Sequence, residues 1–327
     1  MNGMPQRWGL TVPLVGVPLL QHRALIEALP GMGYTDVWSA ETNGSDAFTP
    51  LALAATWEPT LRLGTAIVPV YTRGPALIAM SAATMAAVAP DRFVLGLGAS
   101  SPVIVGDWNA IDFVEPYRRS RDVLRVVRAA LAGERVDATY DSFTIKRFKL
   151  EQAPQPAPRI LLAALRPQML RLAGREADGA ILNWLASTDV PRCVEAIAAP
   201  DAEVVARIFV CPTEDADYAR QLGKMLISTY LTVPAYAAFH EWLGRGESLR
   251  PMHEAWAARD RSGAAAAVPD DVVDALVLHG SPEQCREQVQ AYAEAGVTTP
   301  VMALLPTPEM ADPDGLFDIV GRLGTGA

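Results

Sequence analysis

The chain has 327 residues, of which 50% are hydrophobic and 20% charged, and its formal net charge is −9. This length allows one large domain or two smaller ones, and the hydrophobic fraction is sufficient for a large core. The net negative charge disfavours nucleic acids and anionic membrane surfaces as partners, because both would repel the protein.

The cysteines and the amino-terminal residues bear on the cellular compartment. Cys193, Cys211 and Cys285 are far apart and odd in number, which argues against a disulfide framework and is typical of a reducing cytosol. Residues 1–10 contain no apolar run suited to a signal peptide, and no uninterrupted apolar stretch is long enough to span a bilayer. We therefore expect a cytoplasmic protein that does not bind membranes.

Short apolar runs alternate with amphipathic stretches along the whole chain. The helical spacing of Val123, Leu124, Val127 and Leu131, followed by Gly133, is typical of the amphipathic stretches. The apolar runs are residues 9–12, 36–39, 63–68, 93–97, 160–163, 179–183, 204–210 and 301–305. Eight such runs between helices predict parallel strands that are buried on both faces, in an α/β fold: a single (β/α)8 TIM-barrel domain over residues 1–327.

A doubly wound open sheet is the competing topology, and the number of strands alone does not exclude it. A nucleotide-binding sheet of that kind normally has a Gly-x-Gly-x-x-Gly turn after its first strand, and residues 13–23 contain none. The stretch "GLGAS" follows the fourth apolar run and lacks the third glycine, so it is a weak signal for a dinucleotide site.

Two segments are longer than the connections that a minimal barrel needs. Residues 136–150 alternate as strands do, which predicts a small β excursion before the fifth barrel strand. Residues 232–271 form a longer insertion late in the barrel, with Trp242, Met252 and Trp256 among glycines and prolines. A long insertion of this kind is most often a lid or a dimer contact, and the alternative is a solvated elaboration without a role.

Motifs for several kinds of catalysis are missing from the sequence. The histidines are isolated, and we find no Cys-x-x-Cys, no Gly-x-Ser-x-Gly elbow and no phosphate-binding Walker loop, so no metal site is predicted. The expected strand ends are mostly small and apolar, with few titratable groups. A site at the barrel mouth with so few acids and bases needs a cofactor to carry the chemistry.

The loop after the fifth apolar run is a candidate anion site. Pro167 stands at a favourable first helical position, so the free N–H groups of the following helix should point toward the barrel mouth. Barrels often bind phosphate on their later loops. The alternative is an ordinary helix start at which Arg166 is solvated.

Five stretches in order carry a resemblance to a known family: "GYTDVWSAE", "LRLGTAIVPVYTRGPALIAMSAATM", "DRFVLGLGASSPVIV", "AALRPQMLRLAGREADGAILNW" and "VLHGSPEQCREQVQAYAEAGV". With them the chain resembles the luciferase-like monooxygenase superfamily, and within it the oxidoreductases that use coenzyme F420, an 8-hydroxy-5-deazaflavin. The resemblance covers nearly the whole chain. It implies F420 as the cofactor, with FMN as the runner-up.

The resemblance also implies where the cofactor lies. In the family the ring lies across the barrel mouth over a non-proline cis peptide bond, which matches Ala66–Ile67 here, and the phosphate rests on residues 165–169. Gly96 and Gly98 would keep the fourth strand low beneath the ring, although glycines also relieve crowding inside barrels. The implied cofactor-binding residues are Thr11, Glu41, Ala66, Ile67, Val68, Gly98, Ala99, Ser100, Ala164, Leu165, Arg166, Gln168, Met169, Asn183 and Trp184.

Departures from the family pattern bear on the reaction. Sugar- and alcohol-oxidising members carry a histidine and a glutamate where this chain has Thr42 and Ser101. Without them no base is evident for an alcohol proton, which favours reduction of an activated C=C or C=N bond in a small molecule. We expect Glu41 and Ser101 to be the catalytic residues, with a salt bridge to an arginine as the alternative role of Glu41.

Other functions remain open on the sequence alone. A two-component monooxygenase that uses FMN and a cofactor-binding protein without turnover both fit the motifs. The resemblance further implies a homodimer, and the apolar residues near the second and third strands are candidates for its interface: Leu51, Leu53, Leu77, Ile78 and Met80.

Overall fold

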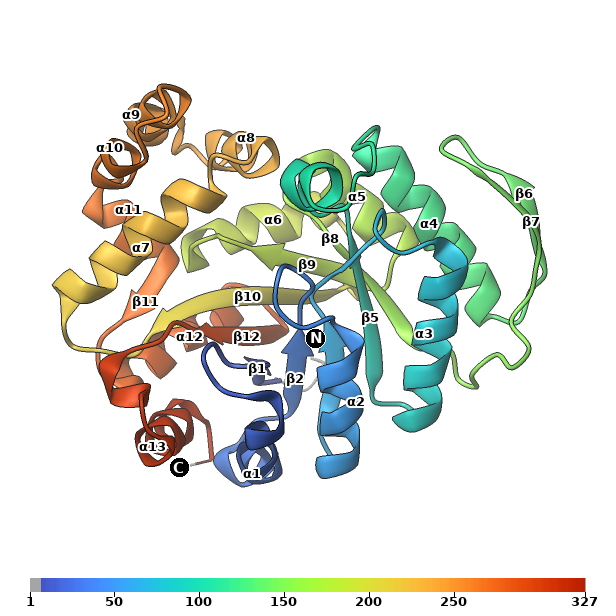
Figure 1. Ribbon diagram of the computed structural model, residues 1–327, viewed down its shortest axis with the longest axis horizontal. Helices are drawn as coiled ribbons and strands as arrows, with labels where there is room; N and C mark the ends of the chain where they lie inside the picture. Colours follow the sequence, from blue (N-terminus) through green and yellow to red (C-terminus); the bar gives the residue numbers. More distant parts are fainter. Residues whose placement is uncertain (1–6, 327) are drawn as a thin grey trace.

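A closed ring of eight parallel strands forms the centre of the computed structural model, which describes residues 7–326 (Figure 1). The ring closes because β12 pairs with β1, with Val301 opposite Gly9. The strands are β1 (Gly9–Thr11), β2 (Asp36–Ser39), β3 (Arg62–Thr65), β5 (Phe93–Gly98), β8 (Arg159–Ala163), β9 (Gly179–Asn183), β10 (Glu203–Cys211) and β12 (Thr299–Leu304). The TIM barrel is thereby confirmed and the open sheet excluded. Most of the residues examined for a signal peptide, 1–6, lie outside the described range.

Two short strands extend the sheet beyond the ring. β4 (Val68–Pro69) pairs with the end of β5, and β11 (Val277–His279) pairs with the end of β10. The apolar run 63–68 was expected as one strand, but β3 ends at Thr65 and pairing resumes only at Val68. The chain leaves the ladder at Ala66 and Ile67, and the peptide bond between these two residues is cis.

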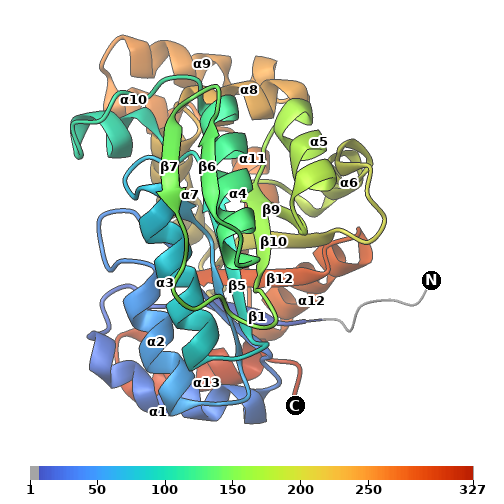
Figure 2. The same ribbon diagram turned by 90° about the vertical axis from the view of Figure 1, so that its right-hand side faces the viewer.

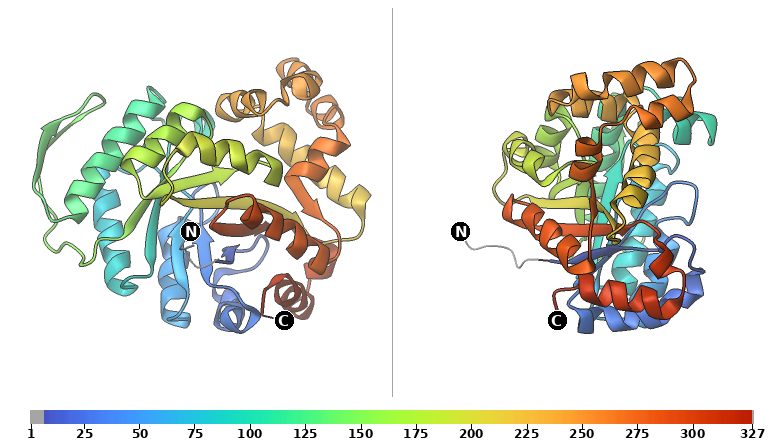
Figure 3. Two further views of the ribbon diagram at one scale, coloured as in Figure 1. Left: turned by 180° about the vertical axis from the view of Figure 1, so that it is seen from behind. Right: turned by 90° about the vertical axis from the view of Figure 1, so that its left-hand side faces the viewer.

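Helices cover the outside of the ring, with α5, α6 and α12 on the side seen from behind (Figure 3). None of the described helices is long and apolar enough to cross a membrane. The helices are α1 (His22–Ala28), α2 (Phe48–Trp57), α3 (Pro75–Val88), α4 (Pro116–Leu131), α5 (Pro167–Glu176), α6 (Val190–Ile197), α7 (Ala216–Tyr230), α8 (Pro234–Trp242), α9 (Gly246–Ala257), α10 (Arg261–Ala266), α11 (Asp270–Leu276), α12 (Pro282–Glu294) and α13 (Pro313–Leu323). Short helical turns are η1 (Leu19–Gln21), η2 (Leu29–Met32), η3 (Val103–Asp107), η4 (Ser187–Asp189) and η5 (Pro308–Met310).

Both segments beyond a minimal barrel are ordered elements. The excursion at 136–150 is an antiparallel hairpin of β6 (Val136–Thr139) and β7 (Thr144–Phe148), which lies outside α4 (Figure 2). The insertion at 232–271 folds into α8, α9, α10 and the start of α11. Figure 2 shows α8, α9 and α10 at the end of the barrel toward which β5 runs. This is the carboxyl end of the strands, where TIM barrels hold their active sites.

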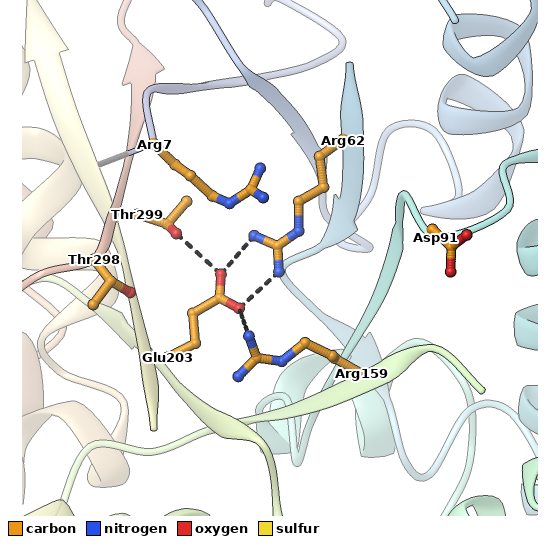
Figure 4. A pocket seen from close by; sticks show the side chains of 7 residues that line it. All are labelled: Arg7, Arg62, Asp91, Arg159, Glu203, Thr298 and Thr299. Atoms are coloured by element: carbon orange, nitrogen blue, oxygen red, sulfur yellow. Dashed lines mark hydrogen bonds and ion pairs between the residues drawn. The ribbon is translucent and has the colours of Figure 1, made fainter. Parts of the chain in front are cut away.

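Side chains inside the ring form layers. The middle layer is an apolar cluster of Trp38, Val94, Leu161, Ile181, Val205 and Val301. Below it, at the amino end, both carboxylate oxygens of Glu203 contact the guanidinium of Arg62, at 2.6 and 2.7 Å. Thr299 donates to Glu203 at 3.0 Å, and Arg159 Nη1 lies 3.2 Å from Glu203 Oε2. These residues line a cavity of about 280 Å³ (Figure 4).

Glu203, Arg62 and Asp36 at the amino end are almost completely buried, whereas their further partners Arg159 and Arg7 are partly exposed. Burial raises the pKa of Asp36, against the opposing effect of Arg62 and Arg7. Burial acts in the same direction on Glu203, but the hydrogen bonds and charge of Arg62 outweigh it and lower the pKa of Glu203. The polar side chains at this end of the barrel are therefore paired with one another, as expected for the face that serves stability.

Candidate active site at the mouth of the barrel

The cis peptide bond between Ala66 and Ile67 is held by the end of β2. The Ala66 N–H donates to the carbonyl of Ser39 at 2.6 Å, and the Glu41 N–H donates to the carbonyl of Ile67 at 3.3 Å. The cis geometry expected from the resemblance is confirmed. Both residues are half-buried and border the apolar cluster, so their backbone forms part of the floor of the mouth.

The two glycines of β5 have different neighbours. A Cβ at Gly96 would lie 1.9 Å from the carbonyl oxygen of Thr65, so the adjacent strand explains this glycine. A Cβ at Gly98 would lie 2.9 Å from Ile67 Cγ1 and 3.0 Å from Ala163 Cβ. Gly96 therefore relieves crowding inside the barrel, whereas Gly98 keeps the floor beside Ile67 free of a side chain.

Two strand ends place a non-glycine residue in the left-handed region. Ser100, after β5, has φ 65°, and Trp184, after β9, has φ 53°. Such conformations are uncommon for these residue types and cluster at functional sites. Ala99 and Ser100 are half-buried at the mouth. The next residue, Ser101, accepts a hydrogen bond from the Ile104 N–H at 3.3 Å, which ties it to η3.

Glu41 is engaged in a salt bridge. Arg73 approaches it with Nη2 at 2.6 Å and Nε at 3.0 Å from Oε1. Both side chains are largely buried. The salt bridge that we considered as the alternative role of Glu41 is therefore present, and the catalytic roles predicted for Glu41 and Ser101 stay predictions.

The helix expected after the fifth strand begins as the sequence indicates. Pro167 is the first residue of α5, with Arg166 as an extended N-cap that is exposed. Leu170 makes the first intrahelical hydrogen bond, to Arg166, at 2.9 Å. The N–H groups of Gln168 and Met169 therefore have no acceptor within the helix and are available to an anion. Phosphate binding by Leu165 to Met169, beside the buried Ala164, stays a prediction.

Unpaired polar atoms lie at the ends of β1 and β9. Among residues 7–326, Thr11 Oγ1, Asn183 Oδ1 and Trp184 Nε1 are buried without a hydrogen-bond partner. Asn183 uses only its Nδ2, which donates to the hydroxyl of Tyr236 on α8 at 2.7 Å. The insertion thus reaches the mouth through Tyr236.

Aromatic side chains build one wall of the mouth. The Trp184 ring stacks on Phe209 with 3.9 Å between centroids, and Tyr230 lies 5.2 Å away. Trp184, predicted to line the cofactor site, is almost fully buried within this wall.

Sequence reasoning missed three side chains of the site. Arg207 lies on β10 directly opposite Asn183, and its Nε is buried without a partner. Tyr236 and Arg73 were not singled out because the helix and loop that carry them could not be assigned to the mouth from sequence. Arg207 had a visible signal: it is the one charged residue inside the apolar run "VVARIFVC".

The fold and this arrangement define a class: a TIM barrel with unpaired polar atoms at the carboxyl ends of its strands, where barrels of this kind hold their active sites. The family described as luciferase-like monooxygenase matches residues 9–299. The chain therefore belongs to the luciferase-like monooxygenase family.

Relatives with assigned names cover most of the chain. A Mycobacterium tuberculosis protein named as a coenzyme F420-dependent oxidoreductase is 28% identical over 87% of this chain and 91% of its own. The 5,10-methylenetetrahydromethanopterin reductase of Methanolobus tindarius is 25% identical over 86% and 89%. The crystal structure of the coenzyme F420-dependent tetrahydromethanopterin reductase from Methanopyrus kandleri superposes with a TM-score of 0.78, at 20% identity over 98% and 99% of the chains. That structural likeness supports the fold.

Proposed function

We propose that the protein is an oxidoreductase that uses coenzyme F420 and a small organic substrate. The observation that carries the proposal is the mouth itself. Its floor is backbone and small side chains, at Ala66, Gly98 and Ala163, and it is bordered by unpaired hydrogen-bonding atoms. Relatives named for F420 and aligned over most of this chain support the choice of cofactor.

The residues present fit a planar ring with an anionic tail. Thr11, Asn183 and Trp184 offer one acceptor or donor each toward the ring, and Gly98 leaves room beneath it. The free N–H groups of Gln168 and Met169 suit the phosphate, and Arg166 is positioned to contact the tail. When bound, the deazaflavin supplies or accepts a hydride at its ring carbon.

We propose reduction of an activated C=C or C=N bond as the direction of reaction. Oxidation of an alcohol needs a base for the hydroxyl proton. The carboxylate nearest the floor, Glu41, is occupied by Arg73, and Ser101 accepts a hydrogen bond from η3. The protein's contribution is then orientation: the reduced deazaflavin would supply the hydride, and solvent water would supply the proton that completes the reduced bond. The insertion at 232–271 would act as a cover over the mouth.

Titration of the protein with F420 and with FMN tests the cofactor, with tryptophan fluorescence as the signal because Trp184 is in the wall. We expect F420 to bind at least tenfold more tightly, because its longer anionic tail reaches Arg166. Comparable affinities would favour the FMN-dependent monooxygenase instead.

Turnover tests the reaction. With reduced F420 and 2-cyclohexen-1-one, we expect the absorbance of oxidised F420 to appear, whereas oxidised F420 with propan-2-ol should remain unchanged. Tight F420 binding without turnover of any enone or imine would identify a cofactor-binding protein.

We also propose a homodimer formed through α2 and α3, neither of which contains a charged residue. Leu77 and Met80 are 47% and 51% exposed on α3, which suits an interface. Leu51 and Ile78, expected at the same interface, are fully buried in the core and do not take part. Light scattering should give twice the chain mass, and Met80→Glu should give the monomer.

The cytoplasm is the compartment that we propose. Cys193, Cys211 and Cys285 are all buried and free, which fits a reducing environment. Fractionation of the source cells, with immunodetection of the chain, tests this proposal.

A further inference from the structure

Arg207 faces the inside of the barrel just below its mouth. Residues 203, 205 and 207 alternate along β10, and the side chains of Glu203 and Val205 lie in the lower and middle layers of the interior. Arg207 therefore occupies the next layer, opposite Asn183 on β9 and Val301 on β12.

The guanidinium of Arg207 has no anionic partner among residues 7–326. Its Nε is buried and unpaired, and its central carbon lies 4.7 Å from the centroid of the Phe209 ring. Tyr230 and Tyr236 are the polar groups nearby. Burial raises the pKa of Tyr236 to about 12, so this phenol is neutral at physiological pH. Burial lowers the pKa of Arg207, but an arginine in a protein remains a cation.

A buried cation without a counterion is unfavourable, and an anion that enters the site relieves this cost. The charge of a buried arginine can instead be neutralised by a side chain of the protein. Arg62, in the same barrel, is an example, since both of its terminal nitrogens contact Glu203. Arg207 is half-buried rather than sealed, so a ligand in the mouth has access to it. The planar fork of a guanidinium fits a carboxylate with two parallel hydrogen bonds.

The surroundings specify the rest of the ligand. The Phe209 ring lies against the guanidinium, and the almost fully buried Trp184 stacks on Phe209. Tyr230, 5.2 Å from Trp184, is half-buried, so of these three rings it is the one that a ligand can contact. An accessible aromatic ring favours a flat, conjugated group next to the charged one.

We propose that Arg207 binds a carboxylate of the substrate, so that the substrates of this protein are unsaturated or imino acids. The proposal rests on the proposed function, because it assigns the substrate class of that same site. Arg207 then determines specificity, because its guanidinium pairs with the carboxylate of the substrate.

Benzoate and benzamide are the probes, because they share a flat ring and differ in charge. Calorimetric titration of the protein loaded with oxidised F420 measures both affinities without turnover. We expect benzoate to bind at least tenfold more tightly than benzamide. Arg207→Gln should abolish this preference and leave benzamide binding unchanged, and Arg207→Lys should retain part of it. Arg23→Gln, which removes an exposed charge on α1, should behave as wild type.

Three results would overturn the proposal: equal affinities of wild type for the two probes, a preference that survives in Arg207→Gln, or a tenfold loss of F420 affinity in that variant. The last would assign the guanidinium to the coenzyme. If Arg207→Gln does not fold, the wild-type comparison and Arg207→Lys decide. If wild type fails to bind F420, the proposed function is wrong, and the same two probes added to the protein without coenzyme still decide the role of Arg207.

Discussion

The two ends of the barrel hold arginines in opposite situations. At the amino end, Arg62 is paired with Glu203 and Asp36, and Glu203 also accepts a hydrogen bond from Thr299. At the carboxyl end, Arg207 has no counterion among residues 7–326, and Asn183 retains an unpaired oxygen. A satisfied polar network stabilises the fold, whereas unpaired polar atoms at a mouth are available to a ligand. The paired groups and the unpaired groups thus lie at opposite ends of the same barrel.

Breaking the pairing at the amino end should have the largest effect. Arg62→Met leaves the Glu203 carboxylate buried without its main partner, and we expect a loss of about 3–5 kcal/mol in the free energy of unfolding by urea. The double variant Arg62→Met/Glu203→Leu should be less destabilised than the single one. A decrease of less than about 1 kcal/mol in the free energy of unfolding of Arg62→Met would contradict the stabilising role of this network.

The helix that brings Tyr236 to the mouth also buries His240. Burial, with the positive charge of Arg245, lowers the pKa of His240 to about 3. Because the unfolded chain binds this proton near pH 6.5, stability should fall as the pH drops from about 6.5 toward 3, by up to about 1.4 kcal/mol per pH unit. Unfolding between pH 4 and 8 measures the slope. His240→Gln should lack this contribution, and an unchanged slope in that variant would argue against it.

Gly98→Val should lower both the stability of the protein and its affinity for F420. The added side chain would press on Ile67 and Ala163, which should cost about 1–3 kcal/mol, and the same crowding should weaken F420 binding. Gly31→Val is the matched control, since a Cβ at Gly31 meets nothing within 4 Å. Normal F420 affinity in Gly98→Val would indicate that the ring does not lie over this floor.

Arg166→Ala should give the smallest effect, and an effect on binding alone. We expect F420 affinity to fall about tenfold, or about 1.4 kcal/mol, with stability within about 0.5 kcal/mol of wild type because the side chain is exposed. FMN, whose tail is shorter, should lose less. Arg171→Ala, an exposed arginine on the same helix, is the control. Unchanged F420 affinity in Arg166→Ala would exclude the tail contact.

Much of the scaffold could be predicted from the sequence. Apolar runs between amphipathic stretches predicted the eight strands of the ring, because parallel strands are buried on both faces. Pro167 predicted the start of α5, and the alternation in 136–150 predicted the β6–β7 hairpin. These features depend on residues close together in the chain. Their periodicity and helix-start residues are therefore visible before folding.

Only the tertiary structure decided which polar groups are paired. Arg62 and Glu203 are 141 positions apart, and Asn183 and Tyr236 are 53 apart, so no local pattern relates them. Gly96 and Gly98 look alike in "GLGAS", yet one faces the Thr65 carbonyl and the other Ile67. Glu41 is bound by Arg73, while Arg207 has no counterion among the described residues. The sequence by itself determined the barrel and its helices, because burial follows local periodicity. Closure of the ring determined which charges inside the barrel are paired, because this pairing depends on distances between strands and loops that are remote in the chain.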